Sequence, residues 1–144
     1  MRLHASCAAR LGPGGYDAVL LLGPPGAGKS GLVLQLIQAG FMLVADDQVL
    51  VERGTASAPA ALAGLLEVRG LGIFRLPCLP SAPLRLVIRL GQVAQRLPEP
   101  GTDPHTGLPA VTIDPACATA LARVTLALDA ACGHVAQLAG AFTA

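Results

Sequence analysis

A phosphate-binding loop constrains this chain more than any other feature of its sequence. Residues 23–30 read G-P-P-G-A-G-K-S and match the pattern G-x-x-x-x-G-K-[ST] at every fixed position. The loop directly follows the apolar run Val19–Leu22, and of the 10 lysines and arginines in the chain only Lys29 is a lysine. Because this loop is built between a strand and a helix, the motif predicts an α/β domain with a nucleotide site.

The residue types in the loop explain how it would hold phosphate. Gly26 and Gly28 allow the backbone to turn its N–H groups inward, and a helix beginning near Lys29 adds the positive end of its dipole. Lys29 would place a charge on the β- and γ-phosphates, and the Ser30 hydroxyl is positioned to bind Mg²⁺. The residues expected to contact the nucleotide are Gly23, Pro24, Pro25, Gly26, Ala27, Gly28, Lys29 and Ser30.

Size and composition narrow the class of protein further. A chain of 144 residues is expected to form a single domain, 1–144, with 53% hydrophobic and 13% charged residues. A net charge of +1 and 3% aromatic residues argue against nucleic-acid binding. The charge-free stretches 30–45 and 130–144 are too short to span a membrane. The four cysteines form no C-x-x-C pair, and with no signal peptide apparent we expect reduced, mostly buried thiols and a cytoplasmic protein.

Hydrophobic periodicity and turn residues predict the order of the elements. Apolar residues at the even positions of 84–90 indicate a strand that buries one face, and prolines and glycines mark 97–107 as an irregular loop. Asp114-Pro115 resembles an N-cap followed by the first residue of a helix. The remaining predictions are strands at 5–11 and 18–22 that form a hairpin, a helix at 29–39 capped by Gly40, a strand at 41–45, an extended segment at 48–52, and strands at 65–69 and 111–113.

Three further groups of residues are candidates for chemistry. Asp46-Asp47 ends the strand after the loop helix, where one carboxylate could reach metal or water and the other could accept a proton. Glu67-Val68-Arg69 precedes two closely spaced glycines, a pattern that fits either a ligand contact or an exposed turn. His4 is either a site base or a surface residue. His105 and His134 lack supporting neighbours, and no cluster has zinc-ligand spacing.

Taken together, these segments resemble a known family. G-P-P-G-A-G-K-S, then L-V-A-D-D-Q-V, then L-E-V-R-G-L-G-I is similar to the catalytic domain of bacterial HPr kinase/phosphorylase, with the match spanning about residues 1–125. The resemblance implies an α/β P-loop kinase domain related to phosphoenolpyruvate carboxykinase, with a mixed sheet and flanking helices. It also implies ATP and Mg²⁺ as cofactors, a serine of the HPr-like phosphocarrier protein of the phosphotransferase system as acceptor, and a homo-oligomer, which is a hexamer in the family.

The resemblance also assigns roles to individual residues. Asp47 matches the proton acceptor for the serine hydroxyl, and Lys29 matches the phosphate-binding lysine. Ser30 and Glu67 match the Mg²⁺ ligands. His4 lies where the family has a histidine before the loop, and Arg96 is the candidate for a late catalytic arginine.

The chain departs from the family pattern in three places. Longer members carry an N-terminal domain, so this sequence resembles the short form. Gly31 follows Ser30 where the family has Glu or Asp, and residues 113–118 lack the arginines associated with dephosphorylation, so the phosphorylase reaction is not expected. Two alternatives stay open: a P-loop kinase that acts on a small molecule, and a nucleotide sensor that binds without transferring phosphate.

Overall fold

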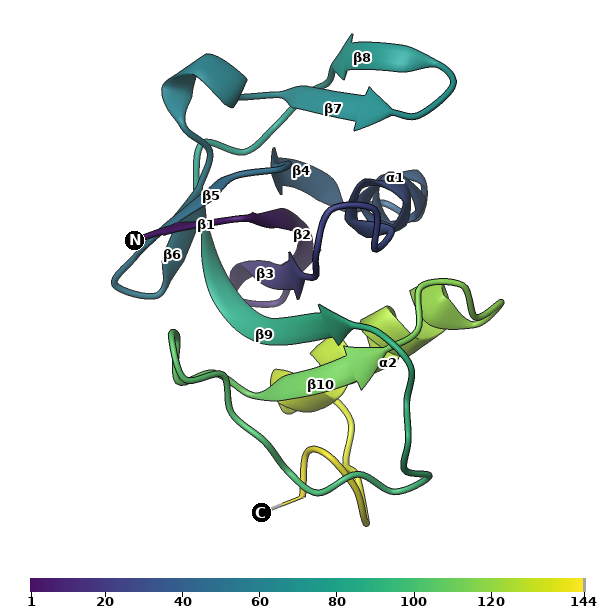
Figure 1. The fold of residues 1–144 in the computed structure, drawn as a ribbon. Helices are drawn as coiled ribbons and strands as arrows, with labels where there is room; N and C mark the ends of the chain where they lie inside the picture. Colours follow the sequence, from purple (N-terminus) through teal and green to yellow (C-terminus); the bar gives the residue numbers. More distant parts are fainter. Residues whose placement is uncertain (144) are drawn as a thin grey trace.

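The computed structural model describes residues 1–143, which form a mixed β-sheet with two helices on one side of its central strands (Figure 1). The helices are α1 (Lys29–Gln38) and α2 (Ala120–Ala131), with one turn of 3₁₀ helix at Ala60–Leu62. The sheet contains β1 (Arg2–Leu3), β2 (Ala5–Gly12), β3 (Gly15–Leu22), β4 (Met42–Ala45), β5 (Val49–Glu52), β6 (Thr55–Ser57), β9 (Ala82–Leu90) and β10 (Ala110–Ile113). A separate hairpin is formed by β7 (Leu65–Val68) and β8 (Gly72–Arg75). Neither helix in this described part has the length and hydropathy to cross a membrane.

Strand pairing explains why the sheet is mixed. The strands follow the order β1-β5-β6-β9-β3-β2-β4, and β10 pairs with β9. The β3–β9 and β9–β10 pairs are parallel, whereas the other pairs are antiparallel. The predicted hairpin of β2 and β3 is confirmed, with Ala5 opposite Leu22 and Gly12 opposite Gly15.

Alternation along the strands separates two hydrophobic cores. Successive side chains point to opposite faces, so adjacent residues such as Leu20 and Leu21 enter different cores. The core beneath the helices includes Val19, Leu21, Leu32, Val33, Leu36, Leu86, Ile88, Val124 and Leu128. The core on the other face, toward β5 and β6, includes Ala18, Leu20, Val44, Val49, Val51, Ala56, Leu84 and Val87.

A bulge in β9 breaks the predicted even-position pattern. Ala18 pairs with Leu84 but Val19 pairs with Leu86, so Arg85 is an extra residue on β9. An extra residue shifts the alternation by one, and Leu84 therefore lies in the opposite core from Leu86. The expectation that all even positions of this strand share one face is therefore wrong at Leu84. The bulge also directs Arg85 to Asp17, with Nε 2.9 Å from the carboxylate.

The helix after the phosphate loop agrees with the prediction. Leu32, Val33 and Leu36 form its buried stripe. Gly40 has a φ of 103°, the left-handed conformation expected just after a helix end. The apolar strand 41–45 is also confirmed as β4, which is buried although it lies beside only one other strand of the main sheet.

The second helix begins later than predicted. The Asp114 carboxylate accepts a hydrogen bond from the Ala116 N–H at 2.9 Å, and the Asp114 carbonyl accepts one from the Cys117 N–H at 3.1 Å. Asp114-Pro115 therefore forms a separate turn. α2 starts at Ala120 instead, with Thr119 as the residue before it. The expectation of mostly buried cysteines is confirmed only for Cys7, since Cys78, Cys117 and Cys132 are half-buried.

Leu36 provides a test of the core under α1. Its side chain is 0% exposed, so Leu36→Ala should leave a cavity and lower the free energy of unfolding by about 2–5 kcal/mol. Leu138→Ala is the matched control, because Leu138 is 97% exposed and its loss should change stability by less than about 0.5 kcal/mol. Denaturant unfolding of both variants measures the difference, and equal destabilisation would contradict this packing.

Candidate active site

A pocket of about 480 Å³ opens where the phosphate loop meets the ends of several strands. Its walls come from the junction of β1 and β2, the start of α1, the second residue after β4, and the β7 strand, which lies next to α1 (Figure 1). The lining residues are His4, Ser6, Pro25, Gly26, Gly28, Lys29, Ser30, Gly31, Asp47, Glu67, Val68 and Arg69. The fold thus gathers segments that are up to 65 positions apart in sequence around the loop (His4 to Arg69).

The phosphate loop has the backbone shape that its glycines predict. Gly26 and Gly28 have φ values of 82° and 102°, a region that other residues rarely adopt. A side chain at Gly23 would lie 3.0 Å from the Ala27 Cβ, and one at Gly28 would lie 3.3 Å from Pro115. Backbone conformation therefore requires glycine at position 26, close packing favours it at position 23, and both apply at Gly28.

Lys29 folds back over the loop that precedes it. Its Nζ donates to the carbonyl oxygens of Gly23 and Pro24, and the side chain is 7% exposed. Burial lowers the pKa of Lys29, while the carboxylates of Asp47 and Asp46 oppose part of this shift. An ammonium group has three protons, so at least one remains available to a ligand in the pocket.

Ser30 and Asp46 form a cluster of oxygen atoms at the start of α1. The Ser30 hydroxyl lies 3.0 Å from each carboxylate oxygen of Asp46, and the buried Ser6 hydroxyl donates to the same carboxylate at 2.7 Å. Carboxylate and hydroxyl oxygens are the hard ligands that Mg²⁺ prefers. The donor set of these residues therefore fits a magnesium ion next to the phosphate loop.

Asp47 is held in an uncommon backbone conformation. Its φ is 70°, and the Gln48 N–H donates to the Asp46 carbonyl at 2.8 Å, which closes a tight three-residue turn around Asp47. The Asp47 carbonyl in turn accepts from the Ala5 N–H at 3.2 Å, and His4 Nδ1 lies 3.5 Å from the Asp47 carboxylate. A strained turn thus presents this carboxylate to the pocket with an imidazole beside it.

The β7 strand contributes the outer wall. Leu66 is fully buried against the core that includes α1, and alternation then directs the neighbouring Glu67 outward, where it lines the pocket. Arg69 follows at the turn of the β7–β8 hairpin and also lines the pocket. Of Glu67 and Asp46, only Asp46 makes a hydrogen bond to Ser30 in the described residues.

The structure brings most of the predicted site residues together. His4, Lys29, Ser30, Asp47 and Glu67 all line this pocket. Arg96 does not: it lines a different cavity of about 720 Å³ between the loop after β9, α2 and residues 135–142. The sequence analysis did not mention Ser6, named Arg69 only as part of the candidate segment Glu67-Val68-Arg69, and did not foresee that Asp46 contacts Ser30. Arg69 had one signal, its position two residues after Glu67.

A phosphate loop between a strand and a helix, facing two carboxylates at the end of the next strand, defines a domain of the P-loop kinase class. The model of the family described as HPr Serine kinase C-terminal domain matches residues 3–79, which is more than half of the chain. This chain belongs to that family. The matched region contains the whole pocket and ends before β9, so it excludes Arg96.

Individual relatives agree with this assignment. The HPr kinase/phosphorylase of Clostridium tetani is 45% identical over 65 residues, which cover 42% of this chain and 21% of that protein. The HPr kinase/phosphorylase of Mycoplasmopsis pulmonis is 31% identical over 106 residues, 66% of this chain and 33% of the relative. The chain thus spans between 21% and 33% of the length of these two proteins.

A solved structure establishes the fold over nearly the full length. The Hpr(Ser) kinase/phosphatase from Coxiella burnetii matches with a TM-score of 0.72 and 21% identity, covering 93% of this chain and 92% of that chain. The predicted fold class, an α/β P-loop kinase domain with a mixed sheet and flanking helices, is confirmed by this match.

Proposed function

We propose that this domain is an ATP- and Mg²⁺-dependent kinase that transfers the γ-phosphoryl group to a serine of a small HPr-like phosphocarrier protein. The observation that carries the proposal is one pocket lined by the phosphate-loop lysine, the strained Asp47 carboxylate and Glu67. Phosphoryl transfer asks mainly for positioning and charge stabilisation, and these residues provide both. Membership of the HPr Serine kinase C-terminal domain family supports the same reaction.

The phosphate loop would hold the triphosphate. Its inward N–H groups and the start of α1 attract anions, and Lys29 would leave the carbonyls of Gly23 and Pro24 to contact the β- and γ-phosphate oxygens. Because Lys29 is largely buried, water screens its charge only weakly, and its attraction to the phosphates is correspondingly strong.

Mg²⁺ would be held by Ser30 with Glu67, and Asp46 is a third candidate because it contacts Ser30 directly. When bound, this ion neutralises charge on the β- and γ-phosphate oxygens. The contact from Ser6 orients the Asp46 carboxylate toward Ser30. These residues thus prepare a set of oxygen ligands before any nucleotide binds.

Asp47 would accept the proton of the attacking serine hydroxyl. The tight turn fixes its carboxylate at the pocket, and a fixed general base contributes typically ~10²–10⁴-fold to the rate. His4 lies beside that carboxylate and would hold its orientation. The acceptor serine must therefore enter between His4, Asp47 and the phosphate loop.

The reaction should run in the kinase direction only. Pro115 packs against the phosphate loop at Gly28, so the turn after β10 borders the site. This turn, residues 113–118, carries no arginine to bind inorganic phosphate for the reverse reaction. When the serine-phosphorylated carrier is incubated with the enzyme and inorganic phosphate, we therefore expect it to lose its phosphoryl group no faster than without enzyme.

Substituting Arg69 and Arg96 tests which arginine adds a positive charge to the site besides Lys29. Arg69 lines the pocket and Arg96 lines another cavity, so Arg69→Ala should lower kcat/KM by about 10–100-fold, as expected for loss of a charge-assisted contact. Arg96→Ala removes the same charge and should leave kcat/KM within about twofold. Initial-rate kinetics decide between them, and the reverse ranking would support Arg96 as the catalytic arginine instead of Arg69.

The proposal is tested with γ-labelled ATP, Mg²⁺ and a purified HPr-like phosphocarrier. We expect label on a serine of the carrier, and none when that serine is replaced by alanine. Binding of ATP without transfer to the carrier or to water would contradict the proposal and support a nucleotide sensor. That alternative has one observation in its favour: Gly31 lines the pocket, and the first turn of α1 carries no acidic residue. Label on a small molecule alone would indicate a small-molecule kinase.

A further inference from the structure

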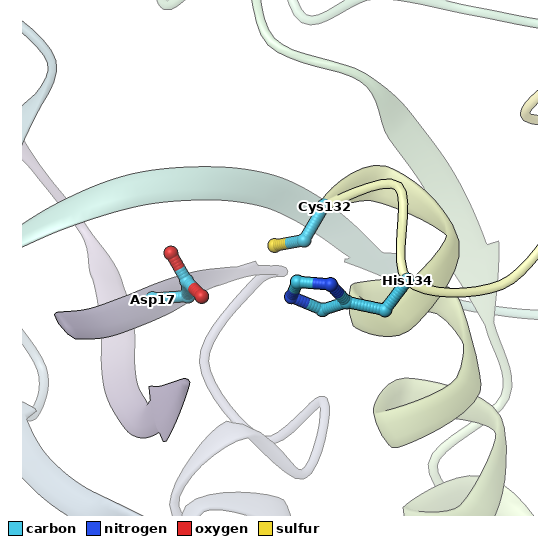
Figure 2. Close-up of side chains that lie close together, drawn as sticks. All are labelled: Asp17, Cys132 and His134. Atoms are coloured by element: carbon cyan, nitrogen blue, oxygen red, sulfur yellow. The ribbon is translucent and has the colours of Figure 1, made fainter. Parts of the chain in front are cut away.

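A second cluster of reactive side chains lies away from the phosphate loop. Asp17, Cys132 and His134 each place one potential metal-binding atom so that all three atoms lie within 4.8 Å of one another (Figure 2). Among residues 1–143 this is the only group of three His, Cys, Asp or Glu side chains with that arrangement. The same three residues, with Gly14, Arg85 and Ala131, line a pocket of about 280 Å³.

The end of α2 presents Cys132 and His134 together. The Gly133 N–H donates to the Ala130 carbonyl at 3.1 Å and the His134 N–H donates to the Asp129 carbonyl at 2.8 Å, which is the pattern of a Schellman motif. Gly133 has the positive φ, 78°, that this motif requires. The turn therefore places the two side chains that flank Gly133 next to the same pocket.

One ion pair holds this turn against the β2–β3 hairpin, and a second, from Arg85 of β9, orients Asp17 of β3. Arg10 of β2 contacts Asp129 of α2 at 2.7 Å, which fixes the helix end beside the hairpin. Arg85 donates from Nε to Oδ1 of Asp17 at 2.9 Å, so the carboxylate is oriented and Oδ2 remains available. An outer hydrogen bond of this kind is what orients a carboxylate ligand in metal sites.

The ligand chemistry selects the metal. A sulfur, an imidazole nitrogen and a carboxylate oxygen are together typical of Zn²⁺, whereas Mg²⁺ takes oxygen ligands. Zinc bonds of about 2.0–2.3 Å place tetrahedral ligand atoms roughly 3.5 Å apart, so the side chains must close by about 1 Å. His134 is exposed at the end of the helix and is free to rotate by that amount.

We propose that Asp17, Cys132 and His134 form a Zn²⁺ site that joins the β2–β3 hairpin to the end of α2, with water as the fourth ligand. Zinc binding displaces the Cys132 thiol proton to solvent as the thiolate–metal bond forms. The bound ion links residues that are more than 110 positions apart, and so stabilises the folded domain.

The test uses the full chain, stripped of metal and titrated with Co²⁺, which reports a cysteine ligand through its thiolate charge-transfer absorption. We expect this band to saturate at one equivalent and to disappear when Zn²⁺ is added. The band should be absent in Cys132→Ser. In His134→Gln the affinity for Co²⁺ should fall by more than ~10–100-fold, the loss typical when a residue that only hydrogen-bonds to a metal ligand is removed. The unfolding midpoint should rise with Zn²⁺ in the original protein but not in Cys132→Ser.

Cys117→Ser is the matched control, because Cys117 is also half-buried and lies before the other end of α2. It should bind Co²⁺ like the original chain. The Ser30–Asp46 cluster contains only oxygen ligands and cannot produce the thiolate band. No band, or a band that persists in Cys132→Ser, would overturn the proposal. His134→Gln alters an exposed side chain, so it keeps the test valid if Cys132→Ser fails to fold. None of these outcomes depends on kinase activity.

Discussion

Replacing Lys29 with methionine should abolish most phosphoryl transfer and weaken ATP binding while the domain stays folded. Methionine keeps an unbranched chain that can occupy the buried position. The lost ammonium group removes a charge-assisted contact to phosphate, worth about 1.5–3 kcal/mol, so Kd for ATP should rise roughly 10–100-fold. It also removes a donor to the transition state, so kcat should fall by ~10²–10³-fold. Calorimetry with MgATP and a transfer assay measure the two effects separately.

Arg75→Met is the matched control for this experiment. Arg75 lies on β8, is exposed, and does not line the phosphate-loop pocket, so it loses the same charge without touching the nucleotide. Its Kd and kcat should stay within about twofold of the original protein. If Lys29→Met bound ATP as tightly as Arg75→Met does, the phosphate loop would not be the nucleotide site.

Local sequence signals predicted the parts of the fold that depend on neighbouring residues. The glycines of the phosphate loop require particular φ values, and the helix that follows the loop needs only apolar residues at helical spacing. The β2–β3 hairpin follows from two apolar runs around a Gly- and Pro-rich turn. Each of these features is fixed within about twenty residues, and each was predicted from the sequence.

Features that depend on tertiary contacts were missed or placed wrongly. The bulge at Arg85 arises from pairing between β3 and β9, whose partners are separated by more than sixty residues, and no local pattern reveals it. α2 starts later than predicted because an aspartate such as Asp114 can either cap a helix or close a short turn, and here it closes a turn.

The same reasoning separates the two candidate sites. His4, Asp47 and Glu67 lie in or near the matching motifs and line the phosphate-loop pocket, whereas Arg96 lies outside these motifs and lines another cavity. Asp17, Cys132 and His134 had no sequence signal, since the sheet and the end of α2 bring them together only in the folded chain. The absence of zinc-ligand spacing in a sequence therefore does not exclude a site assembled from distant residues.

Asp47→Asn should separate chemistry from binding. Asparagine has the same shape and tolerates a positive φ, so the turn around residue 47 and the fold should persist. The amide cannot accept the serine proton, so kcat should fall by ~10²–10⁴-fold while Kd for MgATP changes by less than about threefold. Single-turnover transfer and calorimetry on the same preparation measure both quantities.

Two further substitutions test the backbone strain at this position. Asp47→Gly removes the carboxylate and suits a φ of 70°, so it should be inactive yet at least as stable as the original protein. Asp47→Ala is equally inactive but places a Cβ in the left-handed region, which costs about 1 kcal/mol or more of unfolding free energy. If all three variants unfolded alike, the turn would store no strain. If Asp47→Asn kept full transfer, the general base would be another group, with His4 the nearest candidate because its Nδ1 is 3.5 Å from the carboxylate.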